Sequence, residues 1–216
     1  MKIQRKKSFL SIFIIAVAVS VIFMMPVVSQ AVTFTGLGDL EGGRTRSYAY
    51  AVSADGSTVA GYGYSADGQE AITWTKAGGL TGLGDLSGGE YASRAYGISS
   101  DGSTVVGFGS VDDRGYEAFI WTANDGMKSI GTLGGTRSYA YDASADGSIV
   151  VGYSWNEDGD NEAFLYSRES GAMTGLGALD DEYFNSNAQA VSADGSTVVG
   201  YSSINNNGTE AFIWTQ

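Results

Sequence analysis

Apolar and polar residues alternate in short segments from residue 47 onward. In residues 47–53, small side chains occupy one face and aromatic or β-branched side chains the other, the period of two that predicts a half-buried β-strand. Residues 58–62 and 70–75 are rich in β-branched and aromatic residues and predict two more strands. Asp55-Gly56 between the first two segments predicts a two-residue hairpin turn, because this pair tolerates positive φ. No window after residue 31 has the period of an amphipathic helix, so the pattern predicts an all-β fold.

These segments recur four times with a nearly constant period, which predicts a repeat architecture. The Asp-Gly turn lies at Asp55, Asp101, Asp146 and Asp194, at spacings of 46, 45 and 48 residues. A Glu-Ala pair followed by an aromatic residue begins at Glu70, Glu117, Glu162 and Glu210. A Leu/Ile-Gly-x-Leu element begins at Leu37, Leu83, Ile130 and Leu176. The repeat units are therefore about 37–82, 83–129, 130–175 and 176–216.

Four short strands in about 46 residues match the blade of a β-propeller, so we predict a four-bladed β-propeller. Leu-Gly-x-Leu is taken as the fourth, outermost strand of each blade. Its first copy, at Leu37, precedes the first blade and is expected to complete the last blade beside residues 210–215, which would close the ring and remove open sheet edges. Two alternatives are an open β-solenoid of four stacked units and a pair of chains that form an eight-bladed ring.

The first 31 residues have the layout of a helical signal peptide. Lys2, Arg5, Lys6 and Lys7 precede an apolar run at residues 9–28, and Ser-Gln-Ala at 29–31 predicts cleavage after Ala31. Residues 32–216 then form a single repeat domain, in a secreted protein that is extracellular or periplasmic. Because about 20 apolar residues can cross a bilayer, an uncleaved N-terminal membrane anchor is the alternative.

Composition excludes several classes of function. The chain carries 24 Asp and Glu against 12 Lys and Arg, a formal net charge of −12, so it repels phosphate backbones and anionic lipid. We expect neither a nucleic-acid partner nor, after signal cleavage, a membrane partner. The sequence has no cysteine and no histidine, which excludes disulfides, thiol chemistry and histidine-based catalysis.

Three recurring stretches carry a family resemblance. They read Glu-Ala-Phe-Ile-Trp-Thr, Gly-Gly-Leu-Thr-Gly-Leu-Gly-Asp-Leu-Ser-Gly-Gly and Ala-Val-Ser-Ala-Asp-Gly-Ser-Thr-Val-Val-Gly-Tyr. Together they resemble the bacterial extracellular HAF repeat over nearly the whole chain after residue 31. Glu117, Glu162 and Glu210 replace the histidine of that family's His-Ala-Phe tripeptide. The resemblance implies secretion or surface display and a propeller-like fold, and it implies no defined activity.

Aromatic and cationic side chains share positions on the first strand of each unit and are the candidate binding residues. They are Tyr48, Tyr50, Arg94, Tyr96, Tyr139 and Tyr141, with Arg46 and Arg137 in the adjacent loops. A tyrosine offers a flat apolar face and a hydroxyl, which suit contact with a sugar or a peptide. The alternative is that these residues fill space between blades. We expect a monomeric, non-catalytic binding or structural module with an extracellular glycan or protein ligand.

Two patterns of carboxylates predict further candidate sites, one for calcium and one for catalysis. The loop at 156–162 is dense in oxygen ligands, and Asp158, Asp160 and Glu162 are its candidate calcium ligands, although the loop lacks EF-hand spacing and also fits a solvated hairpin tip. No other cofactor is expected. The repeated glutamates Glu70, Glu117, Glu162 and Glu210 allow an alternative function, an extracellular glycan hydrolase that uses a carboxylate pair. Because four blades would hold them apart, we expect each glutamate to bond to neighbouring backbone, and no catalytic residue is assigned.

Overall fold

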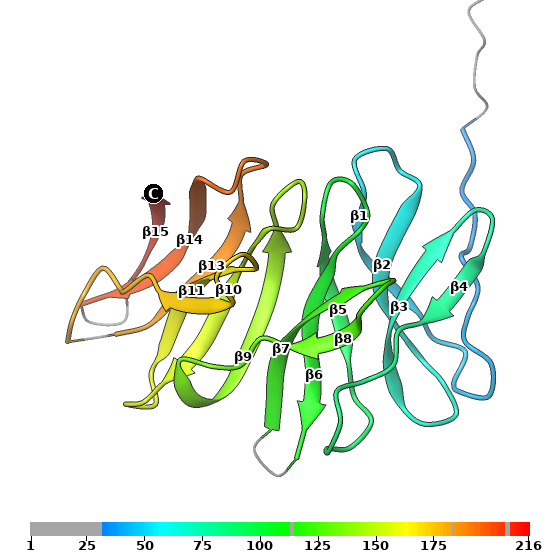
Figure 1. Ribbon diagram of the computed structural model, residues 1–216, viewed down its shortest axis with the longest axis horizontal. Coiled ribbons are helices and arrows are strands. Elements are labelled where there is room, and N and C mark those ends of the chain that lie inside the picture. The colour runs from blue at the N-terminus through cyan, green and yellow to red at the C-terminus, as the bar shows by residue number, and fades with distance from the viewer. Residues whose placement is uncertain (1–31, 113–114, 183, 206–207) are drawn as a thin grey trace, which may run out of the picture. The chain divides into compact units, whose positions relative to one another are not determined.

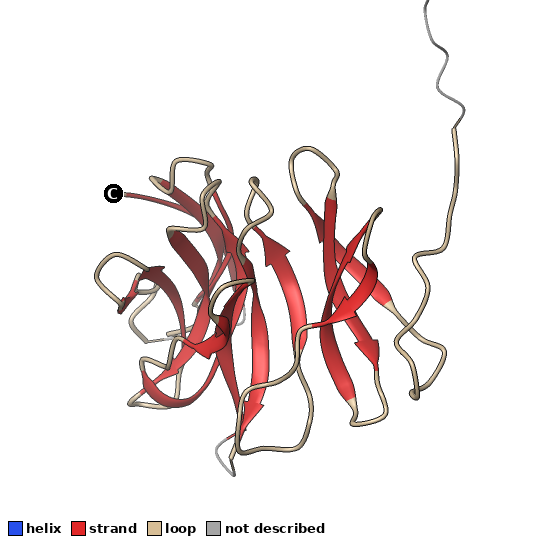
Figure 2. Cartoon of the chain, turned by 45° about the vertical axis from the view of Figure 1, so that its right-hand side comes forward, coloured by secondary structure: helices blue, strands red, loops and turns tan. Residues whose placement is uncertain are grey.

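The domain after residue 35 is built from β-strands. The computed structural model describes residues 32–112, 115–182, 184–205 and 208–216, so the predicted signal peptide lies outside the described residues. Contacts divide the chain into residues 1–35 and the compact unit Gly36–Gln216. That unit contains four antiparallel sheets, and its described residues contain no helix (Figures 1 and 2). In the described part of the chain, no helix is long and apolar enough to span a membrane. The all-β prediction is confirmed.

Each sheet is one contiguous stretch of chain, and we call the sheets blades 1 to 4. Blade 1 consists of β1 (Tyr48–Val52), β2 (Thr58–Tyr64), β3 (Gln69–Thr75) and β4 (Gly79–Gly82). Blade 2 consists of β5 (Arg94–Ile98), β6 (Val105–Val111), β7 (Gly115–Thr122) and β8 (Gly126–Ser129). Blade 3 consists of β9 (Gly134–Ala143), β10 (Ile149–Asn156), β11 (Asn161–Ser167) and β12 (Ala172–Gly175). Blade 4 consists of β13 (Ser186–Val191), β14 (Thr197–Ile204) and β15 (Gly208–Thr215). In every blade the spatial order follows the chain.

A β-bulge on the first strand gives the four blades the same local shape. In β1 the pairing with β2 shifts between Ala49 and Ala51, so Tyr50 is the extra residue of the bulge. The register shifts at the corresponding place in β5, β9 and β13. The bulge brings the carbonyl of Tyr139 so close to Gly152 that a Cβ there would lie 1.9 Å from the carbonyl oxygen. A glycine opposite the bulge is therefore required by close backbone approach.

Apolar side chains pack between each blade and the next. We call the side turned to the following blade the leading face and the side turned to the preceding blade the trailing face. Ala60, Ala71 and Leu83 on the leading face of blade 1 pack on Ala95, Ile98, Val105 and Phe119 on the trailing face of blade 2. Equivalent residues form the cores between blades 2 and 3 and between blades 3 and 4.

Buried serines fasten the same interfaces. Ser93 Oγ accepts a hydrogen bond from the Ala71 N–H at 2.9 Å and donates one to the Gly84 carbonyl at 2.6 Å. Ser138 and Ser186 repeat this arrangement one and two blades later. Each serine thus joins the first strand of its blade to the third strand of the preceding blade and to the loop between them.

The structure corrects two local predictions. The Leu-Gly-x-Leu element is not a strand: it is the loop that leaves the blade, because Gly84 and Gly177 adopt positive φ, and the fourth strand is the segment just before it, such as β4. The Asp55-Gly56 turn is part of a five-residue loop, 53–57, and not a two-residue one. Asp55 Oδ1 accepts hydrogen bonds from the Ser53 hydroxyl and the Ser57 N–H, which stabilise the longer loop.

The predicted ring closure is not seen in this structure. Blade 1 and blade 4 lie at opposite ends of a row, with blades 2 and 3 between them (Figure 1). Packing like that between successive blades is not present between blades 1 and 4 in the described residues. Within the same residues β15 pairs with β14 alone, so blade 4 has three strands where four were expected.

Candidate functional site

A continuous row of aromatic rings crosses blades 1 to 3. Tyr48 stacks on Tyr62 with ring centroids 4.7 Å apart, and Tyr50 contacts both Tyr62 and Tyr96. Tyr96 in turn lies 5.4 Å from Tyr141. We call the following residues the aromatic row: Tyr48, Tyr50, Tyr62, Tyr96, Phe108, Tyr139, Tyr141 and Tyr153.

The bulge on the first strand builds this row. It makes Tyr50, Tyr96 and Tyr141 the extra residues of β1, β5 and β9, where they can reach across to the neighbouring blade. Tyr50 and Tyr96 meet edge to face at 5.4 Å, which is a favourable geometry for aromatic pairs. The bulge residues therefore contact one another across each of the first two blade boundaries, as Tyr50–Tyr96 and Tyr96–Tyr141.

Arg94 inserts a positive charge into the row. Its guanidinium lies 4.7 Å from the centre of the Tyr62 ring and 5.7 Å from that of Phe108, within the range of cation–π attraction. The Arg94 Nε donates a hydrogen bond to Gln69 Oε1 at 2.8 Å, which fixes the side chain across the boundary between blades 1 and 2. The charge is half-buried and adjoins the tyrosines.

One side of the row is packed and the other is open. Tyr62 is 7% exposed and Phe108 is buried, whereas Tyr50 is 51% exposed and Tyr48 is also exposed. Burial raises the pKa of Tyr62 to about 12 and raises the pKa values of Tyr139, Tyr141 and Tyr153 above the ordinary value. These hydroxyls stay protonated near neutral pH, so they can donate hydrogen bonds but do not serve as anionic nucleophiles or bases.

Six of the eight predicted residues come together in this site, namely Tyr48, Tyr50, Arg94, Tyr96, Tyr139 and Tyr141. Arg137 lies over Trp155 on β10, with 5.0 Å between its guanidinium carbon and the ring centre, and it also interacts with Tyr139 at the edge of the row. Arg46 is exposed in the loop before β1. These tyrosines fill space between blades, as in the pairs Tyr50–Tyr96 and Tyr96–Tyr141, and Tyr48 and Tyr50 also keep an exposed side.

Sequence reasoning missed the partners on the second strands, Tyr62, Phe108 and Tyr153. A signal was present: in each repeat an aromatic residue follows the glycine of the second strand. Antiparallel pairing places it directly opposite the first-strand residue, as in Tyr48 and Tyr62. The sequence alone does not give the pairing register of the first and second strands, and this register is what places the two rings on the same face of the sheet.

Two of the four repeated glutamates bond to backbone as expected, whereas Glu117 accepts a hydrogen bond from the Ser129 hydroxyl and Glu210 is exposed. Glu70 Oε1 accepts a hydrogen bond from the Gly84 N–H at 2.9 Å, and Glu162 Oε1 accepts one from the Gly177 N–H at 3.1 Å. Asp85 likewise accepts backbone hydrogen bonds from Leu86, Ala92 and Ser110. Burial is the main cause that raises the pKa of Asp85. These carboxylates hold loops in place.

The candidate calcium loop does not gather its carboxylates. Asn156 Oδ1 accepts hydrogen bonds from the N–H groups of Asp158 and Asp160, which form an exposed hairpin tip. Glu162 is directed to Gly177 instead. Within the described ranges, no group of three or more acidic, histidine or cysteine residues is placed to hold a metal ion.

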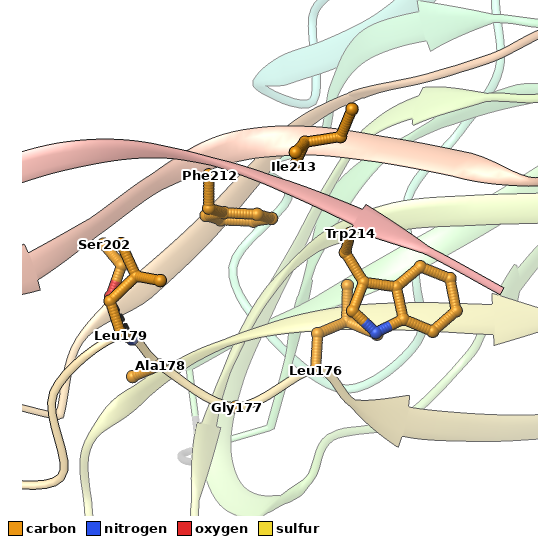
Figure 3. Close-up of a pocket in the computed structure, with 8 residues that line it drawn as sticks. All are labelled: Leu176, Gly177, Ala178, Leu179, Ser202, Phe212, Ile213 and Trp214. Carbon is orange, nitrogen blue, oxygen red and sulfur yellow. Dashed lines mark hydrogen bonds between the residues drawn. The ribbon is translucent and has the colours of Figure 1, made fainter.

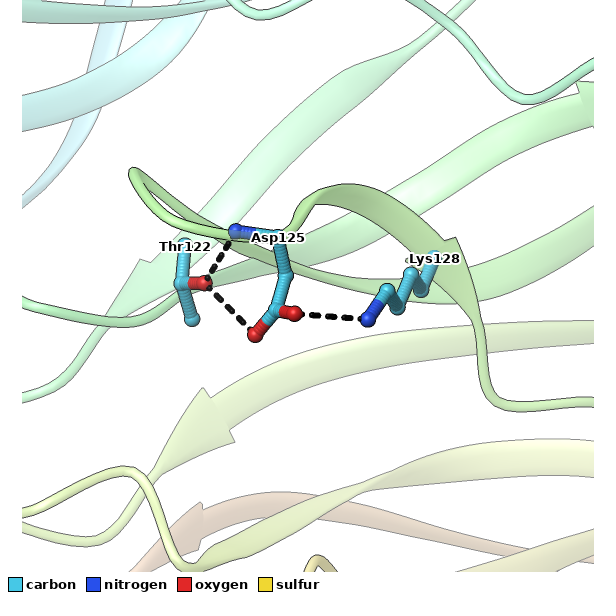
Figure 4. A network of polar contacts seen from close by, with 3 residues as sticks. All are labelled: Thr122, Asp125 and Lys128. Carbon is cyan, nitrogen blue, oxygen red and sulfur yellow. Dashed lines mark hydrogen bonds and ion pairs between the residues drawn. The ribbon is translucent and has the colours of Figure 1, made fainter.

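Two hollows lie away from the aromatic row. One of about 100 Å³ is lined by Leu176, Leu179, Phe212 and Trp214, between the loop after β12 and the strand β15 (Figure 3). Another of about 190 Å³ lies between blades 2 and 3 beside Lys128. Asp125 pairs with Lys128 at 2.7 Å and also bonds to Thr122, so this cation is already neutralised (Figure 4).

Comparison with solved structures identifies the fold. The chain superposes on TolB from Acinetobacter baumannii with a TM-score of 0.59 and 16% identity, over 79% of this chain and 41% of that one. A protein assigned as TolB from Agrobacterium tumefaciens gives the same TM-score and identity, over 82% of this chain and 69% of that one. This chain therefore spans less than half the length of the first of them. The sheets have the blade architecture of TolB-like β-propellers. Comparison of the sequence with family models and with curated proteins finds no match.

Proposed function

We propose that this protein is an exported, non-catalytic binding module that recognises an extracellular or periplasmic glycan through the aromatic row. The observation that carries the proposal is the half-open row itself, in which exposed Tyr50 contacts half-exposed Tyr96 and Arg94 lies over the ring of Tyr62. Flat rings that carry hydroxyl groups suit the apolar faces and hydroxyls of sugar rings. The net charge of −12 favours a ligand that is uncharged or cationic.

Export is supported by the signal-peptide layout of residues 1–31, and the HAF-repeat resemblance points the same way. A protein ligand is the alternative, and a lack of binding to every glycan in the experiment below would favour it. In either case, a preformed aromatic surface recognises the ligand without a covalent step.

A glycan hydrolase is the alternative function. It needs two carboxylates that face a common open site within about 10 Å. Asp85 is close enough to Glu70 for the Glu70 charge to raise its pKa, but this is the smallest of the causes. Both side chains bond to backbone N–H groups. Because both carboxylates are engaged in hydrogen bonds that hold loops in place, the structure favours binding over hydrolysis.

The test is binding of the secreted protein to a glycan array, with a glycosidase assay run in parallel. Tyr50→Ala combined with Tyr96→Ala should reduce affinity for any glycan that binds at least tenfold, while Tyr91→Ala, a loop tyrosine outside the row, should leave it unchanged. Circular dichroism checks that each variant is folded. Glycan cleavage that is lost in Glu70→Gln would instead support the hydrolase, and binding that survives the double substitution would place the site elsewhere.

A further inference from the structure

Blade 4 has an open edge where the other blades have a fourth strand. In blade 3, residues Phe164 to Ser167 of β11 pair with β12, and the corresponding strands of blades 1 and 2 pair in the same register. The equivalent part of β15 is Phe212 to Thr215. Within the described residues this edge has no strand beside it. An unpaired edge of this kind is a template for an added strand.

The hollow in Figure 3 lies where the missing strand would place one apolar side chain. In blade 2, Met127 of β8 lies opposite Trp121, and both residues pack, together with Leu86, against the core cluster that contains Leu83. In blade 3, Met173 of β12 packs in the corresponding cluster. In blade 4 the corresponding surface is formed by Leu176, Leu179, Phe212 and Trp214, and these residues line the hollow of about 100 Å³. The open edge therefore offers both backbone pairing and a specific apolar pocket.

A segment of this chain has the matching sequence. Residues 33–36 read Thr-Phe-Thr-Gly and precede Leu37-Gly-Asp-Leu, just as Gly79-Leu-Thr-Gly precedes Leu83-Gly-Asp-Leu in blade 1. In this alignment Phe34 takes the place of Leu80, Met127 and Met173. Val32 and Phe34 are fully exposed in the structure. A segment with the sequence of a fourth strand, including its pocket side chain, thus precedes blade 1.

The loop that follows this segment makes one of the two hydrogen bonds that the equivalent loops make. In the first inter-blade loop, Gly84 donates its N–H to Glu70 of the preceding blade and its carbonyl accepts from Ser93 of the following blade. At the start of the domain, the Gly38 carbonyl accepts from Ser47 Oγ at 2.7 Å. The glutamate for the other half of this arrangement is Glu210, which is exposed on β15.

Both end faces expose residues that are buried inside the row of blades. On the leading face of blade 4, Val199 is 42% exposed, whereas the equivalent Val106 and Val151 are completely buried. Ile213 on the same face is 71% exposed. On the trailing face of blade 1, Val52 is exposed, whereas the equivalent Ile98 is buried. The two faces match each other as the faces of successive blades do.

We propose that two copies of this chain assemble head to tail, and that residues 33–36 of each copy form the fourth strand of blade 4 in the other. Phe34 fills the pocket between Leu179 and Trp214, Glu210 accepts a hydrogen bond from the Gly38 N–H of the other copy, and Val199 and Ile213 become buried.

The arrangement of the domain favours a second copy over closure within one chain. The loop at Gly38 is held to blade 1 by Ser47, and blade 1 does not lie beside blade 4. Two copies of four blades give eight, the upper end of the usual propeller range, and a twofold ring closes both heterologous interfaces. The proposal therefore replaces the expected monomer with a dimer.

The first experiment measures mass. The protein secreted from the full chain is expected to sediment as a dimer. Ile213→Asp should convert it to a monomer with an unchanged circular dichroism spectrum, because this side chain is mostly exposed within one copy. Ala77→Asp, in the exposed turn between β3 and β4, is the matched control and should stay dimeric.

The second experiment identifies the strand. Thr35 should lie opposite Ile213, as Thr174 lies opposite Leu165, a spacing that suits a disulfide in a chain without native cysteine. Thr35→Cys mixed with Ile213→Cys should give a covalent dimer under oxidation, whereas Thr35→Cys mixed with Ala77→Cys should not. A disulfide only within a doubly substituted monomer would overturn the proposal in favour of ring closure in one chain. A monomer with no linkage would overturn it as well.

Discussion

Asp142 on β9 accepts a hydrogen bond from the backbone N–H of Val191 on β13, with 2.9 Å between the Asp142 Oδ2 and the nitrogen. The other oxygen of Asp142 accepts from the Ala143 N–H at 2.9 Å, so one half-buried carboxylate joins blade 3 to blade 4. In blade 2 the same position is Gly97, whose Cβ would lie 2.5 Å from the carbonyl oxygen of Tyr141. Neighbouring blades thus meet either through a carboxylate or through direct backbone contact.

Replacing Asp142 should loosen the last blade. Asp142→Ala leaves the Val191 N–H without its partner, and we expect the free energy of unfolding in urea to fall by about 1–3 kcal/mol. Asp142→Asn keeps one acceptor oxygen and should have an intermediate effect. An Asp142→Ala protein as stable as the unmodified one would show that water satisfies this N–H group.

The glycine opposite the bulge should not tolerate a side chain. A Cβ at Gly152 would collide with the Tyr139 carbonyl oxygen at 1.9 Å, so Gly152→Ala should lower the free energy of unfolding by about 3 kcal/mol. The control is Gly63→Ala on β2, where the nearest atom is a side-chain carbon of Leu40 at 3.5 Å. Similar denaturant midpoints for the two variants would contradict the close approach.

Removing the buried serine hydroxyl at an interface between blades should lower the free energy of unfolding. Ser138 is fully buried, and its Oγ accepts from the Ala118 N–H and donates to the Gly131 carbonyl. Ser138→Ala leaves both backbone groups unpaired, and we expect a loss of about 1–3 kcal/mol in a thermal or urea unfolding experiment. Ser170→Ala, at an exposed turn, should be nearly neutral. The prediction fails if the two substitutions cost the same.

The repeated Asp-Gly loops should make the fold sensitive to acid. Hydrogen bonds from Ser53 and Ser57 hold the pKa of Asp55 at about 2, and equivalent serines do so for Asp146 and Asp194. Because these values lie below the ordinary 3.8, the unfolded chain binds more protons in this range, and stability should decrease as the pH falls from about 4 to about 2.

The melting temperature measured between pH 6 and pH 2 checks this expectation. Combined replacement of Asp55, Asp146 and Asp194 by Asn should lower the melting temperature at pH 6 and flatten its decline toward pH 2. Asp158→Asn, at an exposed hairpin tip, serves as the control. An equally steep decline in the triple variant would assign the acid sensitivity to other groups.

The periodic residues of the sequence were enough to predict four similar sheets and six residues of the candidate site. Position within a repeated strand determines which face a side chain occupies, so Tyr50, Tyr96 and Tyr141 could be aligned without coordinates. The bulge could not be predicted, because an extra residue changes the register without changing the alternation around it. The failure of blades 1 and 4 to meet could not be predicted either. It depends on the angle between blades, which is set by how side chains such as Ala60 and Val106 fill each interface.

In the described parts of the domain, each blade packs on the blade before it and the blade after it, which gives the domain the energetics of a linear array. Opening blade 2 or blade 3 disrupts two interfaces, whereas opening an end blade disrupts one. Backbone amides in blades 1 and 4 should therefore exchange with deuterium faster than those in the middle. Joining the two ends of such an array makes every blade an interior one, so assembly would raise amide protection most in the blades farthest apart along the chain.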